Sequence, residues 1–280
     1  MLFKIVLVMV AFAANSVLCR LALIGHHIDP MSFSLIRVGS GAVVLLGLLF
    51  YSRSPQTYIQ WNIKNAFFLA IYILAFSCAY LQIDTGIGAL LLFGVVQLTM
   101  VLYGYWHGEQ IGMSRGIGLC IALAGIIVLL LPGAHAPDWK YALLMMISGL
   151  AWAAYSIAGR NMTQPIGSTL ANFTLAVPIV LLANILLAQE RYIDWQGWIL
   201  AVLSGGATSS GAYVLWYAIL KHIDRVTAST VQLSVPCLAI IGGSLFVNET
   251  VTGRVILSSL MVLFGILLVI YKIPKKLKHR

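Results

Sequence analysis

The sequence predicts an all-α membrane protein with ten transmembrane helices, arranged as two inverted repeats of five helices. Three observations lead to this fold class. Apolar residues make up 61% of the 280 residues and charged residues only 9%, whereas a soluble domain carries roughly 25% charged residues. Ten segments reach, or nearly reach, the length of about 20 apolar residues that a helix needs to cross a bilayer. The second half of the chain is a faint copy of the first.

The ten expected spans follow one another at short intervals. They cover residues 2–24, 30–51, 65–82, 85–106, 111–131, 139–160, 169–188, 198–220, 226–247 and 254–271. The first is longer than a signal-peptide core and has no small-residue cleavage site, so we expect it to be retained as a span. The segments lack the alternating pattern of a transmembrane barrel, which leaves the helix as their spanning form.

The internal repeat has an offset of 140 positions. It aligns the segments AFAANSVLCR and AWAAYSIAGR, and with them Arg20 and Arg160, Asp84 and Asp224, Glu109 and Glu249. A period this long exceeds that of solenoid repeats and is typical of the duplicated bundles of secondary transporters. Each half holds an odd number of spans, so the second half must enter the membrane from the opposite side. We therefore expect repeats over residues 1–137 and 138–280, the second ending in a short basic tail.

The basic residues predict the orientation. Twelve of the 17 fall on the side of the N-terminus, three fall on the other side, and two, Arg20 and Arg37, lie within spans. An excess of Lys and Arg marks the cytoplasmic side of a membrane protein. Both termini are therefore expected in the cytoplasm.

Polar side chains midway along the spans are candidates for a substrate site, because transport needs a polar site near the bilayer centre. The first repeat offers Asn15 and Ser16 in span one, Phe76 and Tyr80 in span three, and Gln97 in span four. An unpaired amide in hydrocarbon costs several kcal/mol, so these amides should face the bundle interior. There they either line a cavity or bond a neighbouring helix.

The second repeat offers a more aromatic set. Trp152 and Tyr155 lie in span six, Tyr213 and Trp216 in span eight, and Gln232 in span nine. Span eight carries the run SGGATSSGAYVLWY, whose small residues let helices approach closely and let a helix bend or break. The alternative for each aromatic residue is simple packing or a place in an interface belt. Belt positions are most plausible for Tyr80 and Tyr217, which come near span ends.

An aromatic site with amides and hydroxyls suits particular solutes. Aromatic faces attract ammonium groups and stack on planar groups, and amides can bond a zwitterion. A zwitterionic amino acid or a small amine therefore fits better than a bare anion.

The charged residues within and beside the spans leave several roles open. Arg20 and Arg37 could snorkel outward, pair with Asp29 or Asp84, or bind a substrate carboxylate. Glu109 and Glu249 follow spans four and nine, where they could cap the next helix or bond loop amides. No acidic residue lies mid-span, and the six histidines lie in loops, at span ends or in the tail. No proton carrier is evident, which leaves facilitated export, exchange and proton antiport open.

Several site types and partners are not expected. The four cysteines lie in apolar runs without a CxxC pair, so we expect neither a disulfide framework nor a metal site. The sequence has no basic patch interleaved with aromatic residues, so nucleic-acid binding is not expected. No cofactor is expected either. The expected partners are a small-molecule substrate and the lipid bilayer, with the chain either a monomer or a homodimer. Spans five and ten are apolar enough to be scaffold or a dimer face.

Several motifs resemble the drug/metabolite transporter superfamily, in its ten-span branch with two EamA-type repeats. They are FAANSVLCRLAL, FSLIRVGSGAVVLL, GLAWAAYSIAGR and TASTVQLSVPCLAIIGGSLFVNE, and the likeness covers nearly the whole chain. The resemblance implies transport of small metabolites, amino acids prominent among them, mostly outward and in the bacterial inner membrane. It gives the class of protein and not the substrate.

The chain departs from the family pattern at one position. The family places a proline thirteen residues before the glutamate in both repeats; the second repeat has Pro236, but the first has Val96. A proline removes a backbone hydrogen bond and favours a kink. Span nine should therefore be kinked and span four straighter.

We therefore expect a secondary transporter that exports amino acids or related amines by alternating access. One alternative is efflux of hydrophobic or quaternary ammonium cations, although such a site usually includes a carboxylate. A membrane-embedded lipid-modifying enzyme would need clustered His, Asp or Glu, and only His26, His27 and Asp29 cluster. A receptor would normally carry a soluble domain, and a channel would need a path without alternating gates.

Overall fold

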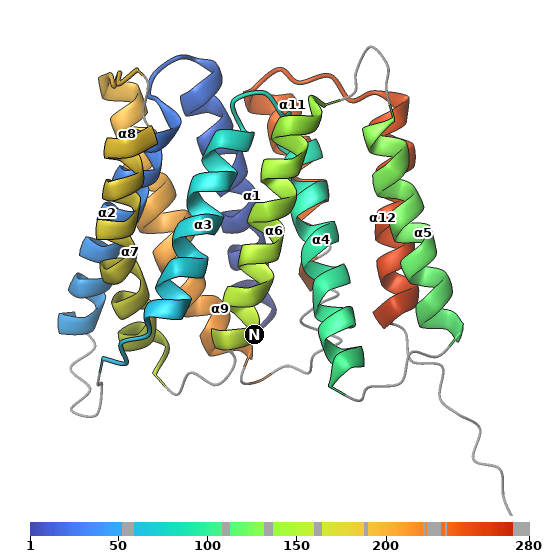
Figure 1. Ribbon diagram of the computed structural model, residues 1–280, viewed down its shortest axis with the longest axis horizontal. Coiled ribbons are helices and arrows are strands. Elements are labelled where there is room, and N and C mark those ends of the chain that lie inside the picture. The colour runs from blue at the N-terminus through green and yellow to red at the C-terminus, as the bar shows by residue number, and fades with distance from the viewer. Residues whose placement is uncertain are drawn as a thin grey trace, which may run out of the picture.

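The computed structural model is a bundle of upright helices (Figure 1). It describes residues 1–51, 59–107, 113–131, 137–159, 164–187, 190–220, 222, 231–232 and 234–270. The helices are α1 Leu2–Ile24, α2 Pro30–Tyr51, α3 Ile63–Ala79, α4 Thr85–Trp106, α5 Met113–Leu130, α6 Trp139–Gly159, α7 Pro165–Leu187, α8 Trp195–Leu203, the π-helix η1 Ser204–Gly211, α9 Ala212–Leu220, α11 Ser234–Phe246 and α12 Gly253–Ile270. The all-α prediction is confirmed for these residues.

The described residues include six helices that are long and apolar enough to cross a membrane. They are α1, α2, α4, α6, α7 and the continuous run Trp195–Ile219. Four shorter apolar helices accompany them: Ile63–Ala79, Gly116–Leu130, Ser234–Phe246 and Gly253–Leu268. The structure thus supports a polytopic helical membrane protein, while ten crossings and their inversion stay predictions.

The sequence placed α1, α2 and α4 correctly at both ends, and the other helix ends shift by up to four residues, except the start of α11, which adjoins residues outside the described ranges. α7 begins at Pro165 instead of residue 169. Proline suits the first helical position because its missing N–H needs no partner there. α8 begins at Trp195 instead of residue 198, because Asp194 caps it by accepting a hydrogen bond from the Gly197 amide at 2.8 Å.

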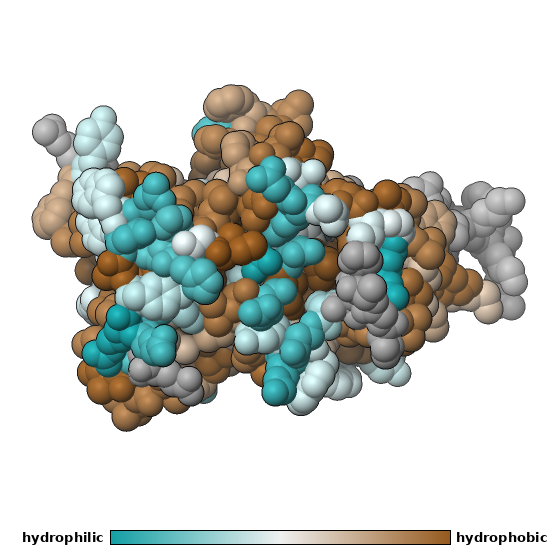
Figure 2. Space-filling model, turned by 90° about the horizontal axis from the view of Figure 1, so that it is seen from above, coloured by the Kyte–Doolittle hydropathy of each residue, from teal (hydrophilic) through white to brown (hydrophobic). Residues whose placement is uncertain are grey.

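The outer surface fits a lipid environment. Viewed from above, polar residues gather on the end of the bundle and apolar residues surround them (Figure 2). Large apolar side chains are exposed along the flanks, such as Leu182 on α7 and Leu260 and Phe264 on α12. Exposed apolar surface on this scale would be a liability in water but suits a bilayer.

The helices pack in pairs that join the two halves of the chain. α2 contacts α7, α1 contacts α11, α4 contacts α6, and α5 packs along α12 at one edge of the bundle (Figure 1). Gly265 of α12 brings that pair close, because a Cβ there would meet the backbone of Ala122 and Gly118 on α5. By contrast, a Cβ added at Gly116 of α5 would meet nothing within 4 Å, so Gly116 takes no part in this close approach.

One end of the bundle, the upper end in Figure 1, is where α1 ends and α2 begins. There the α1–α2 and α7–α8 connections are joined by an antiparallel bridge between Ile28 and Ile193. The His27 ring lies 2.7 Å from an Asp194 carboxylate oxygen. The Gly197 amide, and next the His27 side chain, hold the pKa of Asp194 below its usual range. These contacts fix two loops that are about 165 residues apart in sequence.

Candidate functional site

Aromatic side chains from five helices meet in the middle of the bundle. We call this group the central cluster; its members are Phe12 on α1, Tyr72 and Phe76 on α3, Trp152 and Tyr155 on α6, Phe173 on α7, and Tyr213 and Trp216 on α9. Trp152 lies at the centre of the cluster, with its ring centroid 4.9 Å from that of Tyr72 and 4.8 Å from that of Tyr213. These spacings are typical of favourable ring pairs.

Arg37 of α2 places a cation against this cluster. Its guanidinium carbon lies 5.3 Å from the centre of the Tyr72 ring and 4.9 Å from that of Phe76. Its Nε donates to Ser209 Oγ at 2.9 Å, and its Nη2 donates to the hydroxyls of Tyr72 at 3.1 Å and Tyr213 at 3.4 Å. Nη1 has no partner among the described residues.

The surroundings of Arg37 correct two of the roles the sequence left open. The side chain is fully buried, so it does not snorkel outward. Within the described residues it pairs with neither Asp29 nor Asp84. Polar groups and ring faces hold it inside the bundle, which is a costly position for a charge without a counter-ion.

Asn15 joins α1 to η1 beside the cluster. Its Oδ1 accepts hydrogen bonds from Ser204 at 2.7 Å, Thr208 at 3.2 Å and Ser209 at 3.4 Å. Ser209 thereby links Asn15 to Arg37. Asn15 makes the interhelical bonds that were one of its two expected roles.

The segment η1 brings these groups together because its residues are small. A Cβ added at Gly205 would meet the carbonyl oxygen of Arg37 and the hydroxyl of Ser40, and one at Gly41 would meet the Phe173 ring. The backbones of α2 and η1 therefore approach closely. The sequence predicted a bend or break in SGGATSSG; the structure has a π-helix there, a form that recurs at functional sites.

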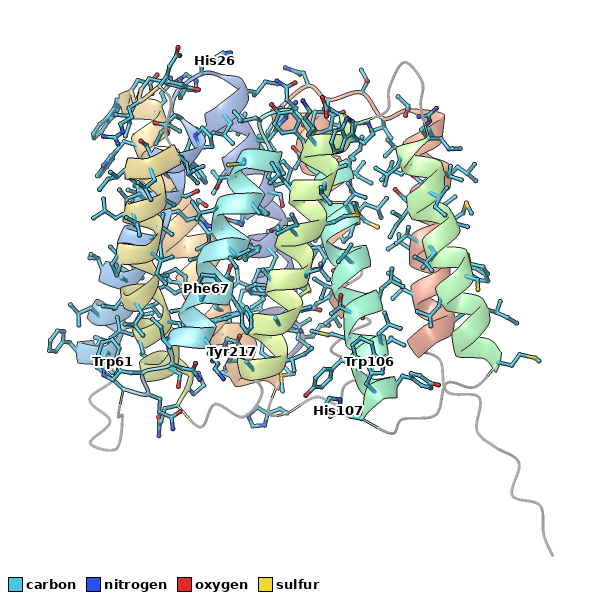
Figure 3. The ribbon with its side chains drawn as sticks, in the orientation of Figure 1. His26, Trp61, Phe67, Trp106, His107 and Tyr217 are labelled. Carbon is cyan, nitrogen blue, oxygen red and sulfur yellow. The ribbon has the colours of Figure 1, made fainter. Side chains whose placement is uncertain are left out.

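Several buried polar atoms around the cluster lack partners in the described residues. They include Trp152 Nε1, Asn172 Oδ1 and the Tyr217 hydroxyl, in addition to Arg37 Nη1. Tyr217 is buried, and Figure 3 shows it in the lower part of the bundle, toward the end that holds Trp61 and Trp106. An orphaned polar atom in a dry interior calls for an explanation, and a ligand is one.

The central cluster is closed to solvent. Each of its members is at most 7% exposed. A cavity of about 150 Å³ lies instead at the upper end, lined by Gln82, Ile83, Asp84, Ile87, Pro137, Thr250, Thr252 and Val255. A solute can therefore reach the cluster only if the helices move.

Arg20 organises a second polar group next to that cavity. Its Nη1 donates to the carbonyl oxygens of Tyr80 and Leu81, each at 2.9 Å, at the end of α3. Its Nε lies 3.3 Å from Glu249 and its Nη2 lies 3.4 Å from Asp84. A cation at the negative end of a helix dipole is favourable.

Glu249 completes this group, which we call the upper lock: Arg20, Asp84, Thr85 and Glu249. Its carboxylate accepts from the Thr85 amide and hydroxyl, each at 2.9 Å. It therefore caps α4, whereas the sequence suggested the following helix or loop amides. Burial raises the pKa of Glu249, and the charge of Asp84 adds to this, although the Thr85 bonds and Arg20 oppose it.

The remaining predicted residues are not members of the central cluster, although the ring of Tyr80 borders it, with its centroid 4.7 Å from that of Phe76. Gln97 is buried on α4, and its Nε2 has no partner within the described ranges; Ser16 and Gln232 are also buried. Tyr80 is fully buried, which removes it from an interface belt, and its hydroxyl donates to the Thr85 carbonyl at 3.2 Å. Pro236 lies in the first turn of α11 as described, so the expected kink stays a prediction. Glu109 lies outside the described residues.

Sequence reasoning missed Phe12 and Phe173 and gave Tyr72 little weight. Phe12 had a signal: it aligns with Trp152 at the repeat offset of 140, and the two rings touch, with centroids 6.1 Å apart. Phe173 had none, because a phenylalanine in an apolar helix looks the same whether it lines a site or fills a core.

Comparison with known proteins finds a transporter family, relatives that match most of the chain, and a solved structure of similar fold. The model of the EamA-like transporter family matches residues 139–271. An uncharacterized protein of Pseudomonas aeruginosa is 42% identical over 265 residues, covering 95% of this chain and 92% of that protein. Probable amino-acid metabolite efflux pumps of Salmonella typhimurium and Escherichia coli are 22% and 23% identical, covering 94% and 93% of this chain and 92% and 91% of theirs. A crystal structure of a protein matches with a TM-score of 0.65 at 17% identity, covering 94% of this chain and 97% of that chain, which indicates a shared fold.

Proposed function

This chain belongs to the EamA-like transporter family, and on that premise we propose that it exports an amino acid or a related amine from the cytoplasm of a bacterium. It is a membrane transporter and not an enzyme, as its relatives are named transporters and efflux pumps. Two relatives carry the name probable amino-acid metabolite efflux pump, which supports the solute class. Another is named an inner membrane transporter, which supports the bacterial inner membrane as the location.

The proposed architecture is ten crossings in two inverted repeats, with both termini in the cytoplasm. The helix contacts support it. The 140-residue offset pairs α1 with α6, α2 with α7, α3 with η1, α4 with α11 and α5 with α12. If each helix is exchanged for its partner, the α1–α11 contact becomes the observed α6–α4 contact, and the α2–η1 contact becomes the observed α7–α3 contact. The α2–α7 and α5–α12 contacts each remain the same pair. A two-fold pseudosymmetric bundle requires such a pattern.

The substrate site is the central cluster together with Arg37. The observation that carries this assignment is a buried cation with an unpaired N–H, set among aromatic rings from helices of both repeats. Aromatic faces and a few convergent polar groups are what small-molecule sites usually offer. Because both repeats supply rings, movement of one repeat against the other would open the site.

Alternating access is the mechanism that suits a closed site. The upper lock and the His27–Asp194 contact hold the upper end shut in this conformation, and that end faces outward in the proposed orientation. Release of a solute outward requires these contacts to part. The π-helix η1 offers a joint, because its hydrogen-bond pattern differs from that of the helices on either side.

The alternative of cation efflux has less support. No acidic residue in the described part of the chain touches the central cluster, and the charge that does is Arg37. A lipophilic cation would meet repulsion from Arg37 without a carboxylate to offset it. Facilitated export, exchange and proton antiport stay open as coupling modes.

Transport by the purified protein in proteoliposomes tests the proposal. A panel of labelled amino acids and amines should include at least one solute that moves faster than in protein-free vesicles. Replacing Trp152 or Tyr213 with alanine should slow that movement about fivefold, because one aromatic ring contact contributes on the order of 1 kcal/mol.

The matched control is Trp198→Ala, which removes an exposed tryptophan that stacks on Trp195. Equal amounts of folded protein, measured by size-exclusion chromatography, separate a transport defect from misfolding. If no solute moves under any gradient, the transport proposal fails. If W152A and Y213A transport like the unaltered protein, the central cluster is not the site.

A further inference from the structure

We infer that Arg37 is the anchor for an ionised carboxylate on the transported solute, so that the site takes amino acids and other aromatic or apolar carboxylic acids in preference to bare amines. This inference rests on the proposed function and narrows its solute class. It starts from the charge, the hydrogen bonds and the ring faces around one side chain.

The charge of Arg37 has no counterpart in the described residues. The side chain is fully buried. The two acidic residues that the sequence offered as partners are engaged elsewhere, at the upper end: Asp29 accepts from the amides of Met31 and Ser32, and Asp84 pairs with Arg20. A guanidinium stays protonated even when it is buried. A solute that brings one negative charge would therefore neutralise the site.

The hydrogen bonds of Arg37 leave one of its donor groups available for a carboxylate. Nε and Nη2 of Arg37 already donate, while Nη1 has no partner among the described residues. A guanidinium binds a carboxylate best through two parallel N–H groups. The hydroxyls of Tyr72 and Tyr213 accept from Nη2, and a tyrosine hydroxyl that accepts a hydrogen bond can still donate its own proton. A carboxylate oxygen near Nη1 and Nη2 would thus meet N–H and O–H donors together.

The ring faces describe the rest of the solute. Tyr72 and Phe76 lie against the guanidinium itself. The Trp152 ring packs against the rings of Tyr72 and Tyr213, and the Phe12 ring meets the Trp152 ring edge-on. These rings form an apolar wall a few ångströms from the charge, which suits a planar or branched apolar side chain. The unpaired Nε1–H of Trp152 adds one donor and no acceptor, so it too favours an anionic over a cationic group.

The repeat gives Arg37 a further distinction. Its counterpart at the offset of 140 is Val177, an apolar residue. A residue that only held the pseudosymmetric bundle together would be expected to recur in both halves, as Arg20 does. The charge instead occurs once, beside a cluster to which both halves contribute.

The test compares matched solutes on the purified, full-length protein. Phenylalanine, tryptophan and leucine are each assayed with their amides and with the acids that lack the amino group. Binding is measured by thermal stabilisation in detergent, and transport by inhibition of labelled amino-acid uptake into proteoliposomes. We expect each acid and amino acid to act at concentrations at least about tenfold lower than the corresponding amide.

Arg37→Gln should remove this preference, so that acid and amide act alike. Arg191→Gln is the control, since Arg191 is exposed and bonds only the Asn184 carbonyl in the described residues; it should leave the preference unchanged. Should R37Q fail to fold, Tyr72→Phe and Tyr213→Phe keep both rings and remove the hydroxyls. Each of those should reduce the preference for the acid several-fold.

Three results would overturn the inference. The amides could act as well as the acids, R37Q could keep the preference, or no acid in the panel could bind. The first two leave transport itself intact, so they differ from failure of the proposed function, in which no solute moves at all.

Discussion

Asn15 is the residue whose removal should cost most among the amides singled out here. Its Oδ1 accepts from hydroxyls on Ser204, Thr208 and Ser209 in a fully buried setting. Asn15→Ala leaves these donors without their acceptor and should lower the free energy of unfolding by about 1–2 kcal/mol. Thermal unfolding in detergent measures the change.

Gln196→Ala is the control for that measurement. Gln196 is exposed at the start of α8, so its removal should change stability by less than about 0.5 kcal/mol. A stability loss for N15A no larger than that of Q196A would mean that water replaces the missing acceptor.

The residues of the site show what a sequence can predict at this scale. Buried amides and mid-span aromatic residues are visible because they are costly or large, which is how Asn15, Trp152 and Tyr213 were found. The environment of Arg37 was not visible, because Ser209, Tyr72 and Tyr213 are between 35 and 176 positions away. Three-dimensional neighbours over such distances come from packing and not from local pattern.

The π-helix η1 is the element whose replacement should be least tolerated. Gly205 faces the Arg37 carbonyl so closely that a methyl group has no room. Gly205→Ala should push α2 and η1 apart and lower stability by about 1–3 kcal/mol, the usual cost of overpacking. Because Ser209 would move with η1, transport should fall as well. Thermal unfolding and proteoliposome uptake measure the two effects.

Gly47→Ala is the matched control within α2. A Cβ at Gly47 meets nothing within 4 Å, and alanine is a better helix former, so this variant should gain about 0.5–1 kcal/mol. If G205A is as stable as G47A, the close approach of α2 and η1 is not a constraint on this fold.

Element boundaries were predictable where the membrane dictates them and less so where local chemistry does. The long apolar runs gave both ends of α1, α2 and α4. The start of α8 depended on the cap by Asp194, which an apolar count ignores. Pro178 lies inside α7 without ending it, since neighbouring helices can compensate for a lost bond in a membrane. The π-helix could be predicted only as a weak point, because several irregular forms suit small residues equally.

The whole bundle should place residues 1 and 280 on the same side of the membrane. Ten crossings bring the chain back to the side where it began, and the basic residues make that side the cytoplasm. Reporter tags fused at either end should therefore respond as cytoplasmic, and a tag inserted after the exposed His26, at the upper end in Figure 3, as external. Tags at the two ends that report opposite sides would exclude an even number of crossings.

The upper lock should make the stability of the whole molecule depend on pH. The pKa of Glu249 is raised, chiefly by burial, so the folded chain binds this proton more tightly than the unfolded chain does. The contribution is therefore fully present below the ordinary carboxyl pKa of about 4.3 and is lost as pH rises through the raised value. The groups that face Glu249 are Arg20 on α1 and Asp84 and Thr85 at the start of α4.

Thermal unfolding followed from about pH 4, near the ordinary carboxyl pKa, upward through the raised pKa should show this loss in the unaltered protein. Glu249→Gln keeps an acceptor for Thr85 but cannot titrate, so the difference between the two unfolding curves isolates the contribution of Glu249. Glu190→Gln, an exposed carboxyl, controls for changes in net charge.

Because the upper lock must open for outward release, acid on the outer side should also slow solute exchange, and E249Q should lose that dependence. Equal pH slopes for E249Q and the unaltered protein would show that another group sets the titration, and that the lock opens without regard to the proton on Glu249.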